Sequence, residues 1–132
     1  MLRAMRQVVG QIPSCKLDIY GVGPLEERLY QMIVDMNLGQ NVRLCGRTDE
    51  VERVLVRADA FCMSSDYEGM PNAMMEAMAV GVPCVSTDCP CGGPRYLLGT
   101  NGERGLLSPV GDAGAMTKNL ITLLCHEQLK EI

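Results

Sequence analysis

Short apolar runs alternate along this chain with longer segments whose apolar residues recur at helical spacing, and this alternation limits the possible folds most strongly. Runs such as residues 16–20 and 41–45 have the length and composition of strands. Segments such as residues 2–12 carry an apolar stripe on one helical face. Strands that alternate with helices are typical of a parallel sheet covered on both faces. We therefore predict an α/β fold, a Rossmann-like three-layer α/β/α arrangement with a parallel sheet.

The same pattern sets the expected boundaries. Pro24 is expected as the first residue of the second helix, because a missing N–H costs nothing there. Gly81 is expected to stop the helix that starts at Pro71. The predicted strands cover residues 16–20, 41–45, 58–64, 83–86 and 105–107, and the predicted helices residues 2–12, 24–38, 49–57, 71–80, 95–98 and 112–124.

Length and charge narrow the class of protein. A chain of 132 residues fits one domain, which we place at residues 1–132. A net charge of −4 with scattered Lys and Arg argues against nucleic acid as a partner. The apolar runs are too short for a membrane span, and the first residues are too polar for a secretory signal. We therefore expect a cytoplasmic protein.

The seven cysteines fit that setting. Cys45, Cys62 and Cys84 fall in strand-like runs, where a free cysteine behaves as a small apolar residue. Cys89 and Cys91 lack the spacing of a zinc site, and the sequence contains a single histidine. We predict no disulfide framework and no bound metal.

A candidate anion site lies where a strand ends, a loop turns and a helix begins at Pro71. The first amides of that helix, at Asn72 and Ala73, have no acceptor within the helix and lie at the positive end of its dipole. Gly69 allows a ligand to approach the backbone closely. Because the carboxyl ends of parallel strands form the ligand-binding rim, this segment is suited to a diphosphate.

Two glutamates flank this segment. Glu76 has apolar neighbours on every side, so we expect a buried carboxylate that needs a partner. That partner is either a set of sugar hydroxyls or a cation such as Arg95, and the residues alone leave both open. Glu68 lies in the loop and either reaches a bound sugar or is an ordinary exposed acid.

The stretch from Glu68 to Pro90 resembles the E-x7-E segment of the retaining glycosyltransferases with the GT-B fold (family 4, group 1). The match rests on Glu68-Gly69-Met70-Pro71-Asn72 and on Glu76-Ala77-Met78-Ala79 followed by Gly81-Val82-Pro83. Further similarity lies in Tyr20-Gly21-Val22-Gly23-Pro24, in Val42-Arg43-Leu44-Cys45-Gly46 and in Gly102-Glu103-Arg104-Gly105-Leu106. The resemblance covers essentially the whole chain in the order of the family, as the donor-binding C-terminal half of that fold.

The resemblance implies a role for each matched residue. Glu76 would hold the ribose hydroxyls of a nucleoside diphosphate sugar, and Glu68 would face the donor sugar near its reacting carbon as the catalytic residue. Backbone groups of Gly69, Met70, Pro71 and Asn72 would touch the sugar and the distal phosphate. Arg47 and Thr48 would border the base, and Gly21 and Gly23 would line the cleft.

The implied reaction is transfer of a hexose or N-acetylhexosamine with retained configuration to a glycan or lipid-linked acceptor. UDP is favoured over GDP as the nucleotide, and no metal or other cofactor is implied. The usual setting is polysaccharide biosynthesis in a bacterium, with the full-length protein in the cytoplasm or at the inner face of the membrane.

Some features depart from the family pattern. The first strand, the Arg and Lys that clamp the diphosphate, and the acceptor-binding domain are expected to be missing. A sheet without its first strand would expose an edge or an apolar surface through which the chain could dimerise. The loop from Cys89 to Pro94 carries an extra residue, and Tyr96 stands where many relatives have Glu.

Two other functions stay open. A sugar-nucleotide epimerase of the same fold would use different acids and a nearby His. A non-catalytic nucleotide-binding module would have no need of Glu68.

We expect no sugar transfer by this chain alone. A diphosphate without its Arg and Lys clamp loses charge-assisted hydrogen bonds of about 1.5–3 kcal/mol each, roughly tenfold or more in affinity. A radiolabelled transfer assay with nucleotide sugars checks this, and measurable turnover by the isolated chain would contradict it.

Overall fold

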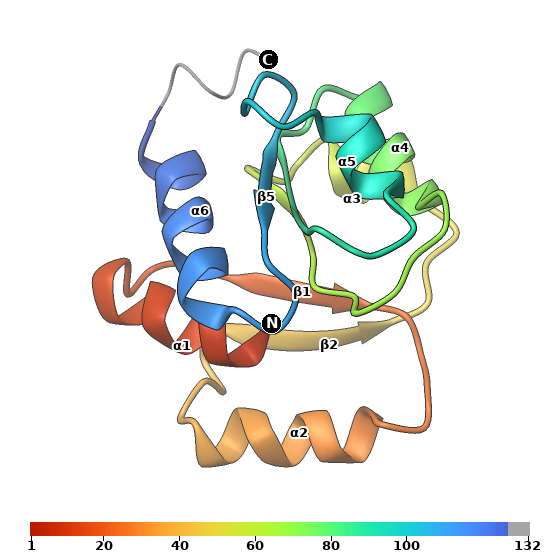
Figure 1. Cartoon of the computed structure of the whole chain (residues 1–132). Helices are drawn as coiled ribbons and strands as arrows, with labels where there is room; N and C mark the ends of the chain where they lie inside the picture. The colour runs from red at the N-terminus through yellow and green to blue at the C-terminus, as the bar shows by residue number, and fades with distance from the viewer. Residues whose placement is uncertain (127–132) are drawn as a thin grey trace. The chain divides into compact units, whose positions relative to one another are not determined.

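The strands form two parallel groups in the computed structural model, which describes residues 1–126 (Figure 1). In the first group β1 (Leu17–Tyr20) pairs with β2 (Val42–Gly46). In the second, β4 (Cys84–Thr87) lies between β3 (Phe61–Met63) and β5 (Leu106–Ser108). Every pairing is parallel, so the predicted α/β class is confirmed.

Helices separate the strands along the chain, as the sequence pattern predicts. They are α1 (Leu2–Gln11), α2 (Glu26–Asp35), α3 (Val51–Leu55), α4 (Asn72–Ala79), α5 (Gly93–Leu98) and α6 (Ala113–Cys125). None of the helices in the described part of the chain has the length and apolar character to cross a bilayer.

Several predicted boundaries differ from the structure, including the start of α2 and the length of β3. Pro24 precedes α2, which begins at Glu26 after Leu25 as N-cap, because residues 24 and 25 form a turn. The strand predicted at residues 58–64 is reduced to Phe61–Met63, since the flanking residues belong to loops.

The chain divides into two compact units, residues 2–50 (the N-terminal unit) and residues 51–126 with Met1 (the C-terminal unit). Residues 127–132 of the domain predicted at 1–132 lie outside the described residues.

In the N-terminal unit, α2 connects the parallel strands β1 and β2. The Asn41 side-chain amide donates to the carbonyls of Pro13 and Cys15, both at 2.9 Å, and ties the entries to the two strands together. Across the pair, Arg43 on β2 forms an ion pair of 2.9 Å with Asp18 on β1. The strand pairing places Asp18 opposite Arg43, which allows this ion pair to form.

In the C-terminal unit, α6 covers one face of the β3–β4–β5 sheet, and α3, α4 and α5 cover the other (Figure 1). This is the predicted three-layer arrangement. All four residues of β4 are buried, as expected for a central parallel strand with helices on both faces. The buried core on the side of α4 consists of Leu55, Met74, Ala77, Val82, Cys84 and Leu98.

Local hydrogen bonds close an end of α4 and an end of α6, and Gly81 stops α4 as predicted. Gly81 has φ +79°, and the Val82 amide donates to the Ala77 carbonyl at 3.0 Å, which closes the end of α4. Asp112 caps α6, because its carboxylate accepts from the Ala115 amide at 2.9 Å.

The cysteines are free, as predicted. Cys62 on β3 and Cys84 on β4 have thiols whose pKa burial raises to about 12. They therefore stay un-ionised and act as apolar packing groups.

We predict that Leu98→Ala lowers the free energy of unfolding by about 2–5 kcal/mol, because this fully buried side chain leaves a cavity in the core. Val56→Ala, at a position 58% exposed, is the control and should change it by less than about 0.5 kcal/mol. Urea unfolding followed by circular dichroism measures both, and equal losses would show that the core is assigned wrongly.

Candidate functional site

The loop after β3 carries Glu68 at the carboxyl end of the sheet. Glu68 is half-buried, and its Oε1 accepts a hydrogen bond of 2.9 Å from the Ser65 hydroxyl. Ser65, three residues earlier in the chain, therefore orients the Glu68 carboxylate.

The loop after β4 fixes the loop after β3 through side chains. The Thr87 hydroxyl and the Cys89 thiol (3.2 Å) both donate to the Ser65 carbonyl. The Cys91 thiol donates to the Tyr67 hydroxyl at 3.0 Å, and this bond raises the pKa of Tyr67. The two loops are therefore joined at more than one point.

Gly93 completes the contact between these loops. A Cβ atom at Gly93 would overlap the Gly69 carbonyl oxygen and stand 3.2 Å from the Pro71 ring. Glycine is therefore required where the start of α5 meets the loop after β3.

The amino end of α4 is open. Pro71 is the N-cap in an extended conformation, and no side chain caps the helix. The amides of Asn72, Ala73 and Met74 donate to no acceptor within residues 1–126, and Asn72 and Ala73 are exposed. Open amides at the positive end of a helix dipole favour an anion. The predicted start of this helix at Pro71 shifts by one residue, and the amides of its first turn stay open.

The expected burial of Glu76 is wrong. Glu76 is exposed, as are Ala73 and Ala79, because α4 buries only the face that carries Met74 and Ala77. No hydrogen bond or ion pair joins the Glu76 side chain to another of the described residues. The apolar neighbours of Glu76 in the sequence are therefore no sign that its side chain is buried, and its contact with a ribose stays a prediction.

Arg95, the cation considered as a partner for Glu76, is paired with Asp88 instead. The Arg95 guanidinium forms a two-bond ion pair with Asp88, with Nε 3.1 Å from Oδ1. The bonds to Asp88 and its charge raise the pKa of Arg95. Arg95 on α5 therefore neutralises a carboxylate of the preceding loop. Tyr96 next to it is 74% exposed.

The remaining predicted contacts of this unit lie at the surface. Gly69 and Met70 are exposed in the loop, whereas Pro71 is buried under Gly93. The structure thus groups Glu68, Gly69, Met70, Pro71, Asn72 and Glu76 in one loop and the helix that follows it.

The other predicted residues gather at the carboxyl ends of β1 and β2 in the N-terminal unit. The Gly21 amide donates to the Gly46 carbonyl at 2.7 Å, and Gly21 has φ +116°. The Thr48 hydroxyl accepts from the Glu50 amide at 3.0 Å and shapes the turn after β2. Gly21, Gly23 and Arg47 are exposed.

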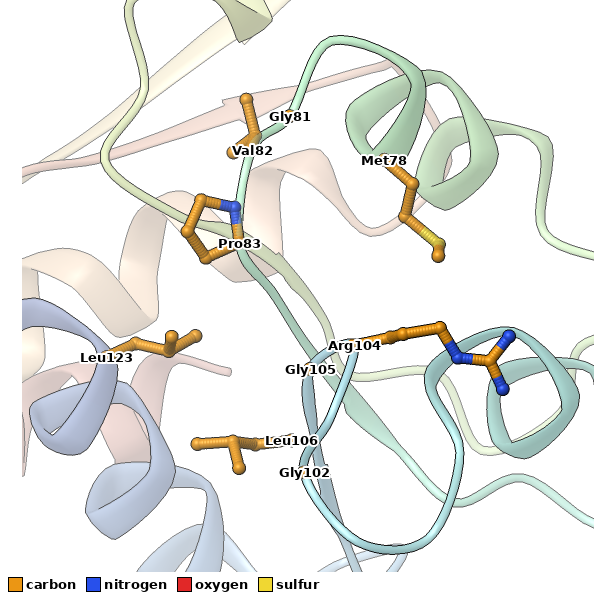
Figure 2. A pocket seen from close by; sticks show the side chains of 9 residues that line it. All are labelled: Met78, Gly81, Val82, Pro83, Gly102, Arg104, Gly105, Leu106 and Leu123. Atoms are coloured by element: carbon orange, nitrogen blue, oxygen red, sulfur yellow. The ribbon is translucent and has the colours of Figure 1, made fainter. Parts of the chain in front are cut away.

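A small hollow of about 180 Å³ lies at the opposite end of the sheet in the C-terminal unit. Pro83 and Gly105, which precede β4 and β5, line it together with Met78, Leu106 and Leu123 (Figure 2). The Arg104 side chain extends toward the neighbouring helix (Figure 2), where it donates to the Tyr96 carbonyl at 3.5 Å. Neither Glu68 nor Glu76 lines this hollow, so it is separate from the candidate site.

Sequence reasoning missed the supporting role of Ser65, Thr87 and Cys89. The Gly/Pro/Cys composition of residues 88–94 marks an unusual loop, and it is the one feature of the sequence that could have indicated these supporting contacts. No cluster of three or more His, Cys, Asp or Glu suited to a metal is found in residues 1–126, and independence from metal stays a prediction.

Comparisons with known proteins show which family and which folds the chain is similar to. The family model described as glycosyl transferases group 1 matches residues 1–126. The putative colanic acid biosynthesis glycosyltransferase WcaL of Salmonella typhimurium is 36% identical over 141 residues, with 99% of this chain and 34% of that protein covered. An uncharacterized glycosyltransferase of Methanocaldococcus jannaschii is 37% identical over 98 residues, covering 74% of this chain and 24% of that protein.

Among solved structures, a TarM variant of S. aureus in complex with fondaparinux, alpha-GlcNAc-glycerol and UDP is similar with a TM-score of 0.93. It is 28% identical, and the match covers 98% of this chain and 26% of that one. The chain therefore spans about a quarter to a third of the length of these proteins.

We predict that Gly93→Ala lowers the free energy of unfolding by about 1–3 kcal/mol, because its Cβ forces the two loops apart. Gly10→Ala is the matched control: it lies in α1 with open space around its Cβ, so it should be neutral or stabilise by about 0.5–1 kcal/mol. Thermal unfolding compares the two, and a neutral Gly93→Ala would show that the loops are not packed this closely.

Proposed function

The chain belongs to the group 1 glycosyl transferases, and from that premise we propose that it binds the nucleoside diphosphate sugar of a retaining transferase. The observation that carries this proposal is the uncapped amino end of α4 next to the Glu68 carboxylate held by Ser65. These two features offer hydrogen-bond donors for an anion and an acceptor for hydroxyls within one loop and helix.

The diphosphate would lie at the first turn of α4. The amides of Asn72, Ala73 and Met74 point out of the helix end, where the dipole favours negative charge. In the reaction, these donors would stabilise the charge that develops on the leaving diphosphate, which is the main catalytic task in such a transfer.

The donor sugar would lie over the loop after β3. Glu68 would accept from its hydroxyls near the reacting carbon, while the exposed backbone of Gly69 and Met70 lets the sugar approach closely. The hexose or N-acetylhexosamine is then transferred with retained configuration to a glycan or lipid-linked acceptor.

The nucleoside would reach toward Glu76. This residue lies four positions after Asn72, roughly 6 Å farther along the helix axis, and its carboxylate is open to solvent. An exposed carboxylate can accept two ribose hydroxyls without leaving a buried charge unpaired when the site is empty. Arg47, Thr48, Gly21 and Gly23, at the carboxyl ends of β1 and β2 in the N-terminal unit, stay proposed contacts of the donor.

UDP is the proposed nucleotide. TarM, the similar structure with the TM-score of 0.93, contains UDP. Independence from metal, a cytoplasmic location, a place at the inner face of the membrane and dimerisation are further proposals of the same kind.

We predict that UDP raises the melting temperature of this chain and that Glu76→Ala removes most of the rise. At about ten times the dissociation constant, a ligand adds roughly 1.4 kcal/mol of stability, which corresponds to about 4–8 °C for a chain of this size. Loss of hydrogen bonds to a charged acceptor should weaken affinity about tenfold. Differential scanning fluorimetry with UDP and GDP at millimolar concentration measures this.

Glu103→Ala is the matched control, since Glu103 is an exposed carboxylate in the turn before β5, at the other end of the sheet. It should leave the UDP shift unchanged. If neither nucleotide shifts the wild-type chain, the donor-binding proposal fails and a module without nucleotide binding is favoured. An equal rise in melting temperature in Glu76→Ala and wild type would show that Glu76 does not contact the nucleotide.

A further inference from the structure

We propose that Ser65 is a positioning residue for the donor sugar, which acts by orienting the carboxylate of Glu68. The inference rests on the proposed function, since it takes the sugar-binding role of Glu68 as its starting point. It adds a residue that the spacing of the two glutamates does not indicate.

Ser65 is bonded through both its backbone and its side chain. Its hydroxyl donates to Glu68 Oε1 at 2.9 Å. Its carbonyl accepts from the Thr87 hydroxyl and from the Cys89 thiol at 3.2 Å. The residue therefore connects Glu68 to the end of β4.

The two side chains that hold the Ser65 carbonyl are buried. Thr87 is 4% exposed and Cys89 is 2% exposed. Thr87 is also the last residue of β4, the strand with helices on both faces. A carbonyl held by two buried donors fixes the backbone of Ser65, and with it the origin of the Ser65 side chain.

The consequence for Glu68 is a carboxylate with one oxygen occupied. Within the described residues no hydrogen bond is made by its second oxygen, Oε2, which is left for a sugar hydroxyl. Fixing the side chain before the ligand arrives removes part of the entropy cost of ordering it on binding. Ser65 should therefore strengthen contacts to the sugar and leave contacts to the nucleotide unchanged.

The test compares a nucleotide sugar with the nucleotide alone. UDP, UDP-glucose and UDP-N-acetylglucosamine are titrated into the whole chain, and binding is followed by amide chemical shifts in NMR, which measure weak affinities. Ser65→Ala should weaken whichever of the two UDP-sugars binds about fivefold, the effect of one lost hydrogen bond, with UDP affinity unchanged.

Conservative variants keep the test informative. Ser65→Thr retains the hydroxyl and should bind like the wild type, and Ser65→Cys, with a weaker donor, should fall between the two. Ser64→Ala is the matched control, because the neighbouring Ser64 hydroxyl makes no hydrogen bond among the described residues. It should change neither affinity.

A double-mutant cycle identifies the residue through which Ser65 acts. In a Glu68→Ala background, Ser65→Ala should have no further effect on UDP-sugar affinity, because the group it orients is gone. A purely structural role would instead give additive losses and would weaken UDP as well.

The outcomes separate this inference from the proposed function. If the wild-type chain binds neither UDP nor a UDP-sugar, the proposed function fails. If it binds both but Ser65→Ala binds the sugar equally well, or loses UDP and UDP-sugar together, only the positioning role is overturned.

Discussion

The burial of β4 on both faces is the constraint on which the C-terminal unit depends. Its four residues are enclosed by α6 on one side and by the core around Met74 and Leu98 on the other. Such a strand must satisfy its polar groups internally. Thr87 does so by donating to the Ser65 carbonyl, and Ser86 donates to the Thr87 carbonyl at 3.0 Å. Burial of the strand thus leads directly to the bond that fixes the loop with Glu68.

Much of the fold could be predicted from the sequence because its determinants are local. The alternation of strand-like and helix-like segments gives the parallel class, and Gly81 and Asp112 mark the ends of their helices through bonds that span only a few residues. The start of α4 is also local, so its open amides could be anticipated to within one residue. Pro24 was misplaced because a proline is equally suited to a turn before the helix.

The supporting contacts of the site could not be predicted in the same way. Ser65 meets Thr87 and Cys89 across 22 and 24 positions, and Gly93 meets Gly69 across the same two loops. Such contacts depend on which strands are neighbours and in what register, which periodicity alone does not give. For Glu76 the sequence predicts burial, and the structure shows exposure. Its neighbours are apolar, but Ala73 and Ala79 are small residues on the exposed face, and only Met74 and Ala77 of α4 are fully buried.

The exposure of Glu76 removes the need for a permanent partner of its carboxylate. A buried carboxylate would need a permanent partner and would leave an uncompensated charge whenever the ligand departed. An exposed one is hydrated in the empty state, so its hydrogen bonds to a ligand replace bonds to water and contribute only their net difference. Glu68 is in a different position, because it is half-buried and already bonded to Ser65. Of the two acids, Glu68 therefore has one carboxylate oxygen oriented by the protein itself, whereas no side-chain bond within the described residues orients Glu76.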